Sequence, residues 1–396
     1  MFLHTDQHIS YQLVRTVPSM YLIALHILLI LVTFILVPNE SRLWTPWSTI
    51  FSFSRHSDHS NPLPQTSNAT GEVDSSELGD SDDESTSSED TLDDDHPDAL
   101  ARSVILDYFT RTGVHRRFRN PAVHSRVEEQ IRSTITSWNL NLPERSCQKY
   151  IRTALDMVGT GFRYIESEEL QVQIGFCTFF TAVFDDGVVG LEAMNEMVPR
   201  YHARKPQLHP ALQCFVDTMT YEMRKHFSTY SANAIATSFL DYANAELLLR
   251  ESKDMQLKPS SSTYIEYIRL REGFSEAWAA FIWPESMCPD PKEYVQAFPD
   301  AMNFIDLIND IFSYYKEAKA GETMTYVNSY ATVHGQNIPQ AMRSLVEQTV
   351  MVVNRIRDLL GEGRARDAWE NFAAGYTQFH LLTPRYRLAE VLPEFF

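Results

Sequence analysis

The sequence predicts an all-α domain over residues 98–396, preceded by a disordered acidic linker and an N-terminal hydrophobic helix. Three observations lead to this prediction. From Asp98 onward, apolar residues recur with the 3.6-residue period of a helix, between short polar breaks. The same part contains no run of alternating strand residues and no internal repeat. A hydrophobic content of 44%, with 12% aromatic residues, is enough for a sizeable core.

Residues 1–18 form an N-terminal segment, and residues 19–38 are predicted to be a transmembrane anchor. The core of that anchor, residues 20–37, has eighteen positions without a formal charge, which just reaches the length needed to cross a bilayer. No convincing signal-peptidase site follows, so an uncleaved anchor is preferred over a cleaved signal or a misassigned start. We therefore expect a membrane-anchored protein whose C-terminal domain lies in the cytosol.

Residues 39–97 are predicted to be a disordered, acidic, Ser-rich linker. Thirteen acidic residues lie between Glu72 and Asp98, with no Lys or Arg among them. Such a segment buries too little apolar surface to offset the entropy lost on ordering. Without these acids the formal charge of −18 falls to about −5, so we expect no nucleic-acid partner. The four cysteines lack CxxC spacing, which argues against a disulfide framework or a zinc site.

Eleven helices are predicted in the folded domain. They span about 98–111, 126–138, 146–164, 168–189, 208–227, 230–251, 261–282, 293–317, 325–332, 337–361 and 364–382. Their boundaries follow from prolines, because proline cannot continue a helix and disfavours helical backbone at the residue before it. The breaks fall at Pro121, Pro143, Pro206, Pro259, Pro284 and the pair Pro289 and Pro291.

Two adjacent carboxylates, Asp185 and Asp186, end the apolar helix that contains Ile174. Carboxylates at such a position are costly unless they are solvated, paired or bound to a metal. Their oxygens suit Mg²⁺, which prefers oxygen ligands. Asp pairs are common at helix ends, so this pair by itself is weak evidence for a metal site.

A second group of oxygen-bearing side chains follows a helical spacing. Asn309, Ser313 and Glu317 lie at i, i+4 and i+8, which places them in one ladder on a helix that is otherwise largely apolar. A polar ladder on a buried helix needs a partner, and Mg²⁺ fits better than a solvated face. Lys316 lies a little to the side, where it could meet an anion held by the metal.

Two further segments carry donors for a diphosphate. Arg385 and Tyr386 lie near the C-terminus, and the planar guanidinium of arginine matches phosphate oxygens; the alternative is a surface basic cluster. Arg269 lies four residues before Gly273, which interrupts an otherwise long helix and could free backbone carbonyls to face a cavity.

At these residues the chain resembles the trichodiene synthase family of fungal class I sesquiterpene cyclases. The stretch NDIFSYYKE, from Asn309 to Glu317, is similar to the metal motif of that family, and PRYRLAE, from Pro384, is similar to its RRYRLSE segment. Arg269 matches its diphosphate-sensing arginine, and Asp185 matches the start of its aspartate-rich motif. The resemblance covers about residues 130–396, in the order of the family.

The resemblance implies a single class I terpenoid synthase helical bundle that ionises a prenyl diphosphate, farnesyl diphosphate being favoured, and cyclises the cation to a sesquiterpene. It implies three Mg²⁺ ions, two of them bound by Asp185, with Asp186 in a supporting contact. The third ion would be bound by Asn309, Ser313 and Glu317. The diphosphate would be held by Arg269, Lys316, Arg385 and Tyr386. Aromatic candidates for stabilising the cation are Phe180, Phe184, Trp278, Phe281, Phe312 and Tyr315. A homodimer is left open.

One departure from the family motif leaves alternatives open. Val189 stands where an acid often follows the Asp pair, and Glu192 is too far along to replace it confidently. A catalytically decayed, membrane-tethered paralogue that only binds is therefore one alternative. A prenyl-chain-elongating transferase is another, although the ladder at residues 309–317 argues against it, because such enzymes use two aspartate-rich motifs.

Overall fold

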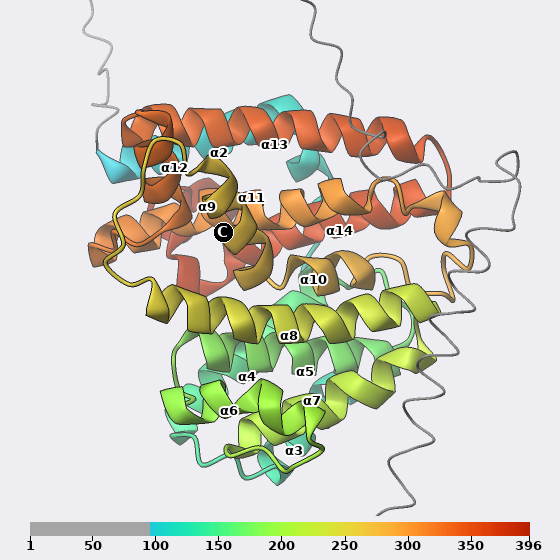
Figure 1. Cartoon of the computed structure of the whole chain (residues 1–396). Coiled ribbons are helices and arrows are strands. Elements are labelled where there is room, and N and C mark those ends of the chain that lie inside the picture. The colour runs from blue at the N-terminus through green and yellow to red at the C-terminus, as the bar shows by residue number, and fades with distance from the viewer. Residues whose placement is uncertain (1–95) are drawn as a thin grey trace, which may run out of the picture. The chain divides into compact units, whose positions relative to one another are not determined.

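The computed structural model describes residues 96–396 as a bundle of α-helices joined by short 3₁₀ turns, with no strand in that range (Figure 1). The α-helices are α2 (Pro97–Thr112), α3 (Ser125–Ser137), α4 (Glu144–Thr160), α5 (Glu168–Asp185), α6 (Leu191–His202), α7 (Pro210–Tyr221), α8 (Thr229–Glu251), α9 (Ser262–Glu272), α10 (Ser275–Phe281), α11 (Phe298–Ala320), α12 (Tyr326–His334), α13 (Ile338–Leu360) and α14 (Arg364–Leu382). The all-α prediction is confirmed for these residues.

The expected membrane-anchored location is corrected by the structure. Within residues 96–396, no helix has both the length and the apolar composition that a membrane crossing requires. The longest helices, α8, α11 and α13, have 23 residues each and all carry several charged side chains. The segment 20–37 on which the expectation rested lies outside the described residues, as do residues 39–95 of the predicted linker 39–97, and we do not carry the membrane assignment further.

Helix α11 lies at the centre of the bundle, between α13 on one side and α10 and α8 on the other (Figure 1). Phe304, Ile308 and Ile311 on this helix are fully buried, because α2, α10 and α13 all pack against it. Helices α4 and α5 pair along their lengths, and α4 also contacts α14. This burial of apolar surface holds the helices that position the candidate site.

Several helix boundaries differ from the prediction. Helix α5 ends at Asp185 rather than near 189, because Gly187 adopts a left-handed conformation with φ of +66°. Helix α6, which contains Pro199, was not among the predicted helices. The predicted helix 261–282 is divided into α9 and α10 at Gly273 and Phe274, where Phe274 has φ of +52°.

Candidate active site

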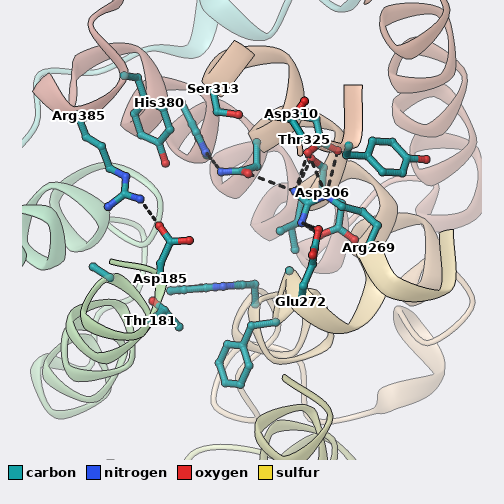
Figure 2. Close-up of a pocket in the computed structure, with 18 of the residues that line it drawn as sticks. Thr181, Asp185, Arg269, Glu272, Asp306, Asp310, Ser313, Thr325, His380 and Arg385 are labelled. Carbon is teal, nitrogen blue, oxygen red and sulfur yellow. Dashed lines mark hydrogen bonds and ion pairs between the residues drawn. The ribbon is translucent and has the colours of Figure 1, made fainter. Parts of the chain in front are cut away.

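A cavity of about 370 Å³ opens between the helices, with side chains from α4, α5, α8, α9, α10, α11, α12 and α14 around it (Figure 2). Eight predicted side chains line it: Asp185, Arg269, Asn309, Ser313, Lys316, Glu317, Arg385 and Tyr386. Asp186 does not line it. The structure therefore brings the aspartate at the end of α5 and the ladder on α11 to one cavity, although more than 120 residues separate them in the sequence.

The two aspartates at the end of α5 have different surroundings. Asp185 faces the cavity and is paired with the guanidinium of Arg385 (Figure 2). Asp186 turns toward α4, where it accepts hydrogen bonds from Lys149 Nζ and Tyr150 OH, each at 2.9 Å. Burial by itself would raise the pKa of Asp186, but the Lys149 hydrogen bond and the Arg385 charge lower it below the usual value. Asp186 thus orients the end of α5 while Asp185 remains directed at the cavity.

The ladder on α11 is held from both sides. Asn309 Oδ1 accepts a hydrogen bond from Arg269 Nη2 at 3.2 Å, and Lys316 Nζ donates to Glu317 Oε1 at 2.9 Å. Ser313, between them, is buried. The ladder therefore presents an amide oxygen, a hydroxyl and a carboxylate to one side of the cavity.

His380 on α14 orients Asn309, a role that the sequence analysis missed. Its Nδ1 lies 2.9 Å from the carbonyl oxygen of Tyr376, so that nitrogen carries the proton and Nε2 accepts from Asn309 Nδ2 at 3.3 Å. Complete burial lowers the pKa of His380 to about 3, which keeps the ring neutral. No sequence spacing pointed to this residue, because the contact joins α14 to α11.

Arg269 is buried on α9 and is already engaged by α11. Its Nε lies 2.9 and 3.0 Å from the two carboxylate oxygens of Asp310, and its Nη2 donates to the backbone oxygen of Asp306 at 3.2 Å. Asp306 and Asp310, one helical turn apart on an apolar helix, were not singled out from the sequence. Their i, i+4 spacing was a usable signal for a cationic partner on a neighbouring helix.

The aromatic lining differs from the predicted set. Two or three of the six candidates were expected to line the cavity, and one of them, Trp278, does so. Phe180, for example, packs in the core against Trp138 and Phe215. The aromatic side chains that do line the cavity are Tyr242, Phe274, Trp278, Tyr326, Tyr376, Phe379 and Tyr386.

Comparisons with known proteins agree on one family. The family described as trichodiene synthase (TRI5) matches residues 112–394. Monoterpene synthase 25 of Postia placenta is 36% identical over 296 residues, covering 74% of this chain and 87% of the relative. Terpene synthase BipA of Cochliobolus sativus is 31% identical, covering 73% and 89%. In fold, the chain is similar to the linalool/nerolidol synthase of Streptomyces clavuligerus in complex with 2-fluorogeranyl diphosphate, with a TM-score of 0.51, 19% identity and coverage of 67% of this chain and 98% of that one.

Proposed function

Because the chain belongs to the trichodiene synthase family and is a terpene cyclase, we propose that it ionises farnesyl diphosphate in a Mg²⁺-dependent reaction and cyclises the cation to a sesquiterpene. The observation that carries the proposal is the shared cavity of Asp185 and the Asn309–Glu317 ladder. Heterolysis of the C–O bond requires that charge developing on the leaving diphosphate is stabilised more in the transition state than in the ground state. Cationic and oxygen-bearing groups around one cavity are suited to that task.

The donor set fits magnesium. The candidate ligands Asp185, Asn309, Ser313 and Glu317 offer only oxygen, and Mg²⁺ is usually bound by one or two carboxylates plus substrate phosphates rather than by an all-protein cage. Accordingly, within residues 96–396 no three Asp, Glu, His or Cys side chains converge to form a metal site by themselves. When bound, Mg²⁺ would neutralise the negative charge of the diphosphate.

The cationic residues hold the diphosphate in this proposal. Arg385 presents its planar fork from the C-terminal segment, while Lys316 lies on the ladder helix. Both are paired with carboxylates in the structure, Arg385 with Asp185 and Asp186, and Lys316 with Glu317. Asp185 and Glu317 are proposed to bind metal, so substrate binding exchanges these two ion pairs for contacts with the diphosphate. Tyr386, which is buried beside Arg385, adds a hydroxyl donor.

Aromatic side chains in the rest of the cavity stabilise the carbocation in this proposal. Trp278, Phe274 and Phe379 present aromatic rings, whose faces can stabilise a cation by about 0.5–2 kcal/mol each. Packed against a bound prenyl chain, these rings would also keep water from the reacting carbon. The shape of this lining decides which conformation the prenyl chain of the substrate adopts before cyclisation.

Geranyl diphosphate is the second candidate substrate, because a relative 36% identical to this chain is named a monoterpene synthase. The test incubates the purified full-length protein with geranyl or farnesyl diphosphate, with Mg²⁺ or EDTA, and identifies extracted products by gas chromatography and mass spectrometry. A cyclic C15 product that requires Mg²⁺ supports the proposal. If a product forms only from geranyl diphosphate, that compound and not farnesyl diphosphate is the substrate.

Two outcomes of the same assay would reject cyclisation. A longer diphosphate formed when isopentenyl diphosphate is added would indicate a chain-elongating transferase. Retained binding of both substrates without any product would indicate a decayed cyclase, the alternative that Val189 motivates. Substrate binding is measured beside product formation because Val189 stands where the family motif often has an acid.

A further inference from the structure

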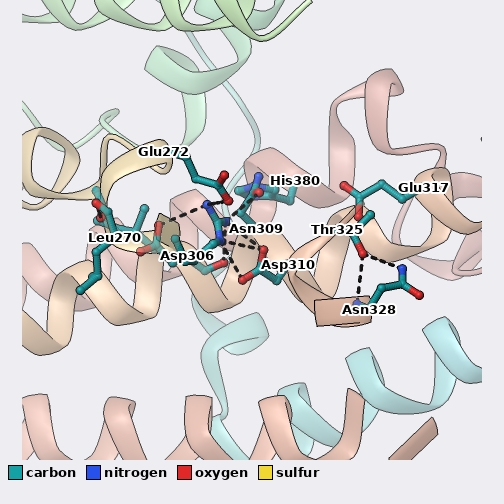
Figure 3. Close-up of polar contacts among 12 residues, drawn as sticks. Leu270, Glu272, Asp306, Asn309, Asp310, Glu317, Thr325, Asn328 and His380 are labelled. Carbon is teal, nitrogen blue, oxygen red and sulfur yellow. Dashed lines mark hydrogen bonds and ion pairs between the residues drawn. The ribbon is translucent and has the colours of Figure 1, made fainter. Parts of the chain in front are cut away.

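Asp306 is buried against the bend between α9 and α10 (Figure 3). Its side chain is 6% exposed, and neither carboxyl oxygen has a hydrogen-bond partner within residues 96–396. A Cβ atom at Gly273 would lie 2.1 Å from Asp306 Oδ1, so only glycine at 273 permits this approach. The absence of a side chain at Gly273 therefore makes room for the buried Asp306 carboxyl group.

Three carboxyl groups surround one guanidinium at this point. Arg269 directs its Nε and Nη2 to Asp310, with the closest contacts at 2.9 Å. Among residues 96–396, the contacts of its Nη1 with carboxylates are longer, at 3.7 Å to Asp306 Oδ1 and 3.8 Å to Glu272 Oε1. The positive charge is therefore committed to Asp310, and Asp306 receives little of it.

An ionised carboxylate in this position would be both desolvated and poorly paired, which strongly disfavours the charged form. The groups that face Asp306 are Arg269 and Glu272 from α9, the hydroxyl of Ser275 from α10, Asp310 from α11 and the buried phenol of Tyr376 from α14. Burial raises the pKa of Asp306 to about 8, and the neighbouring carboxylates add to this rise while Arg269 and the Ser275 hydroxyl oppose it. The burial and weak pairing of Asp306 and the raised pKa thus both favour the uncharged acid.

We propose that Asp306 is a positioning residue that acts as an uncharged carboxylic acid and thereby leaves Nη1 of Arg269 available to the diphosphate of the substrate. An ionised Asp306 would compete for that nitrogen and add negative charge where an anion must bind. A neutral Asp306 fills the space beside Gly273 and holds the bend against α11. It neither competes for Nη1 nor adds negative charge. The part that concerns the diphosphate rests on the proposed function.

The test replaces Asp306 with Asn, which has the same shape as the protonated acid. An acid whose folded-state pKa is raised adds stability at low pH that is lost as pH rises through the folded value. For the wild type we therefore expect the free energy of unfolding to fall between about pH 4 and pH 8, and Asp306→Asn should flatten this part of the profile. Asp358→Asn, at an exposed site on α13, should leave the wild-type profile unchanged.

Ligand binding provides the second readout. With Mg²⁺ present, Asp306→Asn should bind inorganic pyrophosphate within about threefold of the wild type at pH 7, and more tightly than the wild type at pH 9. A loss of tenfold or more at pH 7 would show that the charge of Asp306 is needed, and a variant less stable than the wild type by the same amount at every pH would show that titration of Asp306 does not shape the profile. Either result would overturn the proposal. Failure of the variant to fold would count against the proposal as well.

A spectroscopic measurement needs neither substrate nor metal. The infrared difference spectrum between wild type and Asp306→Asn at pH 7 should contain the C=O stretch of a protonated carboxyl group, and its absence would overturn the proposal. If the wild type failed to bind pyrophosphate at all, the proposed function would fail while the spectrum and the unfolding profile still decided the state of Asp306.

Discussion

Replacing Gly375 with alanine tests whether the close contact between α14 and α4 holds the cavity in shape. A Cβ atom at Gly375 would lie 2.2 Å from the backbone oxygen of Thr160 and 2.9 Å from Gly161 Cα. Ordinary contacts begin near 3.4 Å, so the two helices would have to separate by about 1 Å. Backbone atoms cannot avoid the clash by changing rotamer, unlike the tip of a long side chain.

The expected cost follows from two opposing effects. Overpacking costs about 1–3 kcal/mol, and we take the upper end because the clash is with backbone. Alanine in place of glycine within a helix offsets about 1 kcal/mol. The net loss of about 2 kcal/mol corresponds to a fall in Tm of about 3 °C for a domain of about 300 residues. Helix α14 also carries Tyr376 and His380 to the cavity, and a displacement of about 1 Å can lower turnover by about 10²-fold.

Thermal unfolding followed by circular dichroism, together with kcat/KM, measures both effects. The matched control is Gly190→Ala, because Gly190 has an ordinary φ of −61° and a Cβ atom added there would meet no other atom within 4 Å. Because Gly190 is the N-cap of α6, where alanine is less favourable than glycine, that variant should lose no more than about 1 kcal/mol. A Gly375→Ala protein as stable and as active as the wild type would refute the reasoning.

Three further predictions concern the site and its pH dependence. Asp185→Ala and Glu317→Ala should each lower turnover by at least about 100-fold with unchanged unfolding, since each removes electrostatic stabilisation of the leaving group; a rate like that of the wild type in either variant would remove the site assignment. Chelation of divalent metal with EDTA should abolish product formation, and added Mg²⁺ should restore it; turnover that persists in EDTA would contradict the metal requirement. Because the folded-state pKa of His380 is about 3, below the ordinary value of 6.5, the unfolded chain binds more protons in this window, so the contribution of this residue to stability is lost as pH falls from 6.5 toward 3. His380→Gln should reduce that loss in acid unfolding curves, and an unchanged curve would show that His380 is not the group responsible.

Much of the fold was predictable from local patterns. The apolar periodicity and the prolines located most of the helices, because both act within a few residues along the chain. Helix α6 was not predicted because Pro199 lies within it. The end of α5 was predicted too late because Gly187, whose left-handed conformation ends the helix, was not recognised as a helix terminator.

The site was predictable to the extent that its residues follow a helical spacing. The ladder of Asn309, Ser313 and Glu317 could be read directly, since i, i+4 and i+8 positions share a helix face. The aromatic lining could not, because a phenylalanine on an amphipathic helix looks the same whether it faces a cavity or the core. Phe180 and Trp278 were equally good candidates in the sequence, yet only Trp278 reaches the cavity.

The helical class, the family and the oxygen-bearing residues that the proposed chemistry needs could all be predicted from the amino-acid sequence, because each depends on residue type and short-range spacing. Which charged groups lie close together depends on how the helices pack. Within residues 96–396 this packing paired Arg269 with Asp310, left the Asp306 carboxyl without a hydrogen bond beside Gly273, and placed His380 behind Asn309. The physical reason is that burial and ion pairing depend on distances between helices, and those distances are set by packing across the whole bundle rather than by neighbours along the chain.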